Sequence, residues 1–68
     1  MVGKKTLKDY ELTSLDDYFN MTLNSRIYGQ LKQAKNQFKK MDKGQKIEFL
    51  EFVRINAPEE YNFFINLI

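Results

Sequence analysis

The side chains that could do chemistry in this chain are lysines, carboxylates and amides, because the sequence contains neither histidine nor cysteine. Their absence excludes a Ser–His or Cys–His nucleophile and a metal site built on imidazole or thiolate. The three glycines are isolated, so no glycine-rich phosphate loop is present either. We therefore expect a protein that is not an enzyme, with no catalytic residue, no metal, no cofactor and no small-molecule substrate.

The only dense group of carboxylates lies near the N-terminus, where Asp9 and Glu11 precede the pair Asp16-Asp17. Oxygen ligands of this kind suit a hard cation or general acid chemistry. The simpler interpretation is that these acids cap a helix and keep an amphipathic segment solvated. We favour that interpretation.

Basic residues are concentrated in the middle of the chain, where residues 26–46 carry seven of them against Asp42 alone. Lys32, Lys35 and Lys39 are three and four residues apart, which places them on one face of a helix. Such a face can meet phosphates or an acidic protein surface, or it can be a solvated face that pairs with acidic helices of the same bundle. The candidate contact residues are Arg26, Lys32, Lys35, Lys39, Lys40 and Lys43.

Aromatic residues are abundant, with six Phe and four Tyr making 15% of the chain. Most should lie in the core, but the last two predicted helices are apolar around nearly their whole circumference. A domain this thin should not bury all of these rings, so an apolar excess predicts an interface with a second copy or with a larger protein. The predicted partner-binding residues are Phe49, Phe52, Tyr61, Phe63, Phe64 and Leu67.

Helical spacing and capping signals predict the elements that carry these side chains. A short helix is expected over 15–22 after Ser14, and a longer one over 26–40. In the longer helix Ile27, Leu31, Ala34, Phe38 and Met41 recur at steps of four and three, and Gly29 would lie inside it.

Two further helices are expected over 43–55 and 58–67. Asp42 and Gln45 have the spacing of a capping box at the start of the first. Pro58 disfavours helical geometry at Ala57 and suits the first position of the second.

The fold class that follows is all-α, a single small bundle-like domain of three to five short helices. Residues 1–13 form an N-terminal arm or an extra turn, and residues 14–68 form the helical domain. A 68-residue chain buries only about 60% of its unfolded surface, so its core is small. No stretch has the length of a signal peptide or a membrane helix, which favours a cytoplasmic location and no membrane partner.

The resulting hypothesis is a small non-enzymatic binding protein of the regulator or inhibitor type, the size of many phage or mobile-element accessory proteins. It would dock onto another macromolecule through the apolar surface of its C-terminal helices, aided by the basic helix 26–40. The alternative is a small dimeric nucleic-acid-binding protein that contacts phosphates through Lys32, Lys35, Lys39 and Lys40.

Overall fold

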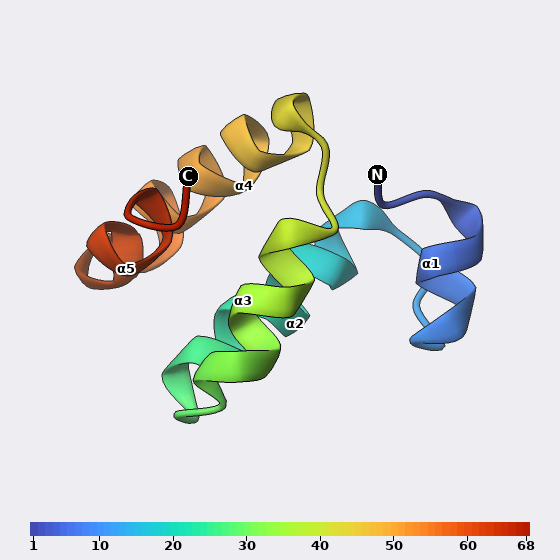
Figure 1. Ribbon diagram of the computed structural model, residues 1–68, viewed down its shortest axis with the longest axis horizontal. Coiled ribbons are helices and arrows are strands. Elements are labelled where there is room, and N and C mark those ends of the chain that lie inside the picture. The colour runs from blue at the N-terminus through green and yellow to red at the C-terminus, as the bar shows by residue number, and fades with distance from the viewer.

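A computed structural model describes residues 1–68 and shows an all-α fold without strands, as the sequence predicts. The long axis of the molecule measures 30 Å. In Figure 1, α1 lies at one end of that axis and α5 at the other, and α4 runs above the pair of α2 and α3. The elements are α1 (Lys4–Asp9), α2 (Leu15–Ile27), α3 (Leu31–Lys39), α4 (Lys43–Asn56), the 3₁₀ turn η1 (Pro58–Glu60) and α5 (Tyr61–Ile65).

The predicted division into helices 15–22 and 26–40 is wrong, because the break falls at Gly29. This residue has φ +80°, a left-handed conformation that glycine adopts without steric cost. The amide of Gly29 donates to the carbonyl of Arg26, and the amide of Gln30 donates to that of Ser25 at 2.8 Å. This is the Schellman motif that ends a helix, so Gly29 reverses the chain between α2 and α3 instead of lying within one helix.

The start of α4 agrees with its predicted capping box. The Asp42 carboxylate accepts from the Gln45 amide at 2.8 Å, and the Gln45 side chain accepts from the Asp42 amide at 3.1 Å. After α4, Pro58 opens a 3₁₀ turn rather than the predicted α-helix, and the α-helical part is confined to Tyr61–Ile65. This turn folds α5 back onto α4.

The core lies where α2, α3, α4 and α5 meet, and it is built mainly of phenylalanine. Phe49 is fully buried, and its ring centroid lies 4.7 Å from that of Phe64, 5.3 Å from that of Phe19 and 5.8 Å from that of Phe38. Offset and edge-to-face contacts of this kind add to the free energy gained from burial. One connected cluster of rings therefore holds four helices together.

The N-terminal segment, predicted as an arm or an extra turn, is a helical turn fastened to the domain. Val2 is buried, and its backbone amide and carbonyl both bond to the side chain of Gln45, at 3.0 and 2.8 Å. Farther along, the Tyr10 ring packs edge-on against Tyr18 at 5.7 Å. Residues 1–13 thus belong to the packed structure. None of the helices combines the length and the apolar character that crossing a bilayer requires.

Candidate functional site

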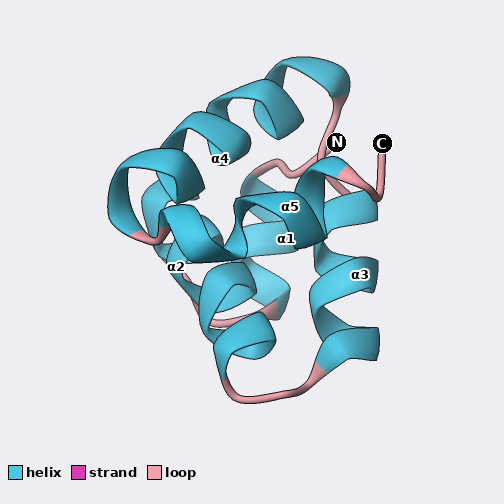
Figure 2. Ribbon diagram, turned by 90° about the vertical axis from the view of Figure 1, so that its left-hand side faces the viewer, coloured by secondary structure: helices cyan, strands magenta, loops and turns pink.

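Helix α3 is the most exposed of the longer helices, and it lies at one edge of the molecule in Figure 2. Only Ala34, Gln37 and Phe38 among its nine residues are buried. Its contacts with the rest of the domain are made chiefly with α2, which runs antiparallel to it (Figure 2). Most of the circumference of α3 is therefore open to solvent.

The exposed part of α3 carries the predicted row of lysines. Lys32, Lys35 and Lys39 are all exposed, and none forms an ion pair with a carboxylate. The alternative considered for this face, pairing with acidic helices of the same bundle, does not occur. Lys43, at the first position of α4, is exposed and unpaired as well. We call Lys32, Lys35 and Lys39 the lysine row.

Two of the predicted basic contacts are occupied within the domain. Arg26 pairs with Glu60 at 2.8 Å and lies over the ring of Phe63, so it joins α2 to the C-terminal segment. Lys40 donates from Nζ to the hydroxyl of Tyr10 at 2.9 Å, and it has no carboxylate partner. Arg26 is accordingly a structural residue, whereas the ammonium of Lys40 stays free to meet an anion.

Two of the six predicted partner-binding residues are interior, so the prediction is wrong for Phe49 and Phe64. Phe49 and Phe64 are completely buried, and Phe52 and Phe63 are half-buried against them. The remaining two predicted residues, Tyr61 and Leu67, are also half-buried. The rings are covered because they pack on one another and because η1 turns α5 back over α4.

The apolar side chains that do remain exposed are mostly isoleucines outside the predicted set. On α4, Ile47 is 59% exposed and Ile55 is 67% exposed. At the turn between α2 and α3, Ile27, Tyr28 and Leu31 are exposed. Their types gave no reason to prefer them over the phenylalanines, because only the packing decides which apolar side chains reach the surface.

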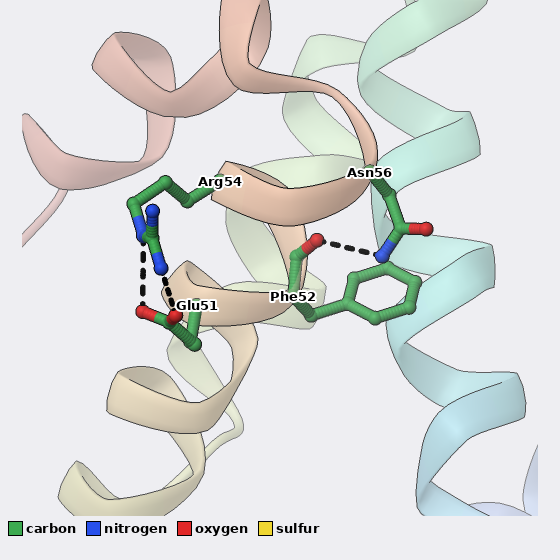
Figure 3. A network of polar contacts seen from close by, with 4 residues as sticks. All are labelled: Glu51, Phe52, Arg54 and Asn56. Carbon is green, nitrogen blue, oxygen red and sulfur yellow. Dashed lines mark hydrogen bonds and ion pairs between the residues drawn. The ribbon is translucent and has the colours of Figure 1, made fainter.

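One pair of opposite charges on α4, unlike the lysines of α3, is neutralised locally. Figure 3 shows Arg54 bonded to the carboxylate of Glu51 one turn earlier, with Nε to Oε2 at 3.1 Å. The hydrogen bonds from Arg54 hold the pKa of Glu51 below its ordinary value and raise the pKa of Arg54. In the same figure the Asn56 side chain donates to the Phe52 carbonyl at 2.8 Å, near the end of the helix.

A second set of polar side chains lies beside the lysine row. Gln33, Asn36 and Lys40 follow one another at steps of three and four and form the neighbouring face of α3. Gln33 and Asn36 border a groove between α2 and α3 whose wall on α2 includes Met21 and Ser25. The spacing of the amides could have indicated one face, but the groove exists only because α2 packs against α3.

The carboxylates near the N-terminus do not form a site. Asp17 accepts from the Thr13 hydroxyl at 2.9 Å and its backbone amide donates to the Ser14 hydroxyl, so it belongs to the start of α2. The hydrogen bond from Thr13 is the main cause that lowers the pKa of Asp17. No three acidic side chains gather into a group that could hold a metal ion.

The site therefore consists of the lysine row with Lys40 and Lys43 beside it, next to a groove lined with amides. It contains many hydrogen-bond donors and positive charges, and no nucleophile paired with a base. No family model, curated protein or solved structure matches this chain.

Proposed function

We propose that this protein is a non-enzymatic binding protein whose α3 contacts the phosphates of a nucleic acid. The observation that carries the proposal is the lysine row, three exposed ammonium groups on one helix face without a carboxylate partner. A row of unpaired cations is repelled by its own charge, and a polyanion relieves that repulsion while releasing counterions. Lys40 and Lys43 extend the same positive region at the C-terminal end of α3.

The test compares two triple variants that lose the same charge. In one, Lys32, Lys35 and Lys39 are replaced by Gln; in the control, Lys4, Lys5 and Lys8 of α1 are replaced by Gln. All six lysines are exposed, so both variants should fold. Binding to labelled single-stranded and duplex oligonucleotides is measured by fluorescence anisotropy over a series of salt concentrations.

The α3 variant is expected to weaken binding and to flatten the plot of log affinity against log salt. Loss of three phosphate contacts reduces the slope by about 2 for a single strand and by nearly 3 for a duplex. The control should keep the slope of the natural chain. Equal losses in both variants, or no binding by the natural chain, would refute the proposal.

A second candidate is docking onto another protein or a second copy, and the exposed Ile47 and Ile55 on one face of α4 favour it. Replacement of both by Ser should then abolish self-association or capture of the partner without unfolding the domain. Light scattering over a concentration series measures the mass of each chain. A constant monomer mass for the natural chain would count against a self-made interface.

A further inference from the structure

The groove between α2 and α3 is lined by uncharged side chains, most of which carry a hydrogen-bonding group. It has a volume of about 430 Å³. Four amide side chains from α3 and its N-cap border it, with the Ser25 hydroxyl opposite and Tyr10 beside them. The lining residues include no acid and no base. A ligand that fits must be neutral where it enters the groove and must offer both donors and acceptors.

Gln37 shows that the groove contains an unused donor. This side chain is only 6% exposed, and its Oε1, at 3.1 Å, shares the Ser25 hydroxyl proton with the Met21 carbonyl at 3.0 Å. Its Nε2 has no protein partner, and no fully buried side-chain polar atom in the domain lacks one. The amide nitrogen of Gln37 therefore reaches solvent through the groove that this residue lines. A buried amide held in place by one hydrogen bond is a fixed donor for an acceptor on a ligand.

A positive charge lies next to this neutral groove. Lys40 donates to the hydroxyl of Tyr10, and Tyr10 is itself a lining residue. Gln33 and Lys40 are seven residues apart on α3, or about 10 Å along the helix. A nucleotide combines these two features: its base is an uncharged group with hydrogen-bond donors and acceptors, and its phosphate is an anion a short distance away.

We propose that the amide groove receives an unpaired base of a single-stranded nucleic acid, with a neighbouring phosphate on Lys40. The inference rests on the proposed function, and it specifies the class of nucleic acid. The groove recedes between two helices, so a base must leave its stack to enter it. A base in a duplex exposes only its edges in the grooves of the double helix, whereas a base in a single strand can be splayed out.

The experiment measures the affinity of the natural chain for a 12-nucleotide single strand, for the corresponding duplex and for an abasic strand of the same charge. A double variant, Gln33→Ala with Asn36→Ala, removes two amides from the groove, and it should fold because both side chains are exposed. The matched control is Asn62→Ala with Asn66→Ala, two exposed amides of α5 and its C-cap that do not line the groove. Circular dichroism checks the helical content of each variant.

The natural chain should bind the single strand roughly tenfold more tightly than the duplex or the abasic strand, since about one or two base hydrogen bonds are at stake. The groove variant should lose the same factor on the single strand and nothing on the abasic strand. The control variant should lose nothing on either. The proposed function survives and the inference fails if duplex and single strand bind equally, or if the groove variant binds all probes as the natural chain does. Absence of binding to every probe overturns both.

Discussion

The pair of α2 and α3 and the unit of α4 with α5 use their side chains in opposite ways. Around α4 and α5 the aromatic rings are turned inward, and the exposed Arg54 has Glu51 as a neighbour. On α3 the lysines are turned outward and have no such partner. The aromatic excess is therefore accounted for by the fold, whereas the lysine excess is not.

The comparison shows whether an excess of aromatic residues or an excess of unpaired charge indicates a functional surface in a small domain. A phenylalanine side chain is large relative to a core of twelve residues, so a few rings fill that core without leaving a patch. A lysine row contributes nothing to the core and incurs self-repulsion. In this chain, unpaired charge indicates a binding surface better than the content of apolar residues does.

Removal of the central ring, that of Phe49, should destabilise both regions, because both pack against it. We expect Phe49→Ala to lower the free energy of unfolding by about 3–5 kcal/mol, since a buried ring is lost and a cavity remains. Ile47→Ala on the same helix should cost about 0.5 kcal/mol or less, because that side chain is mostly exposed. Urea denaturation followed by circular dichroism measures both. Similar losses would mean that the core does not centre on Phe49.

Tyr18 connects the two helices of the α2–α3 pair through one hydrogen bond. Its hydroxyl donates to the Gln37 carbonyl at 2.9 Å, in the last turn of α3 where carbonyls lack a helical donor. Tyr18→Phe should lower the free energy of unfolding by about 1–3 kcal/mol, because a buried acceptor is left unpaired. The ring itself stays, so the aromatic contacts are an internal control.

The same residue predicts a loss of stability in alkali. Burial raises the pKa of the Tyr18 phenol, so the folded chain keeps its proton where the unfolded chain loses it. This contribution is complete below about pH 10, the ordinary value for tyrosine, and declines as the pH rises further. The stability difference between the natural chain and Tyr18→Phe should shrink in that range. A difference independent of pH would contradict the assignment.

The segments just before and just after α3 show how much of this fold the sequence predicts. Local rules suffice for Asp42 and Gln45, since a capping box requires only residues three apart. They fail at Gly29, because the apolar spacing from Ile27 to Leu31 is the same across a turn as along a continuous helix. A glycine in a helical pattern has two interpretations, and only the packing of α2 on α3 selects the turn.

The candidate site also has a part that the sequence predicts and a part that it does not. The lysine row could be predicted, because three residues on one helix face follow from spacing alone. The burial of Gln37 and the groove could not, since they need a second helix to be placed beside the first. Phe49 and Phe64 were wrongly predicted to lie on a docking surface, because their burial depends on α5 turning back over α4.

One substitution of a glycine and one substitution by glycine test whether the chain turns at Gly29 between α2 and α3. Gly29 and Glu11 occupy the same position of two Schellman motifs, at φ +80° and +59°. Gly29→Ala should destabilise the fold by about 1–2 kcal/mol, and Glu11→Gly should be neutral or stabilising by up to about 1 kcal/mol. Thermal unfolding shows whether each variant is more or less stable than the natural chain. Stabilisation by Gly29→Ala would favour one continuous helix over 26–40.

The attachment of the N-terminal segment to α4 depends on Gln45, which bonds to both Val2 and Asp42. Gln45→Ala should cost about 1 kcal/mol, the usual value of a helix cap, and should loosen residues 1–12. Hydrogen exchange of the amides in α1 reads the local effect. Gln33→Ala, an exposed amide in α3, is the matched control and should leave α1 unchanged.

The smallest effect is expected in acid, at the start of α2. The hydrogen bond from the Thr13 hydroxyl lowers the pKa of Asp17, so the folded chain favours the carboxylate. Its contribution to stability is present above the ordinary carboxyl pKa of about 4 and is lost as the pH falls through the lowered value. Thr13→Val should therefore flatten the decline of stability with acid below pH 4 without affecting the lysine row. Thr6→Val, whose hydroxyl has no carboxylate partner, should leave the decline as it is, and an equal change in both variants would show that Asp17 is not its source.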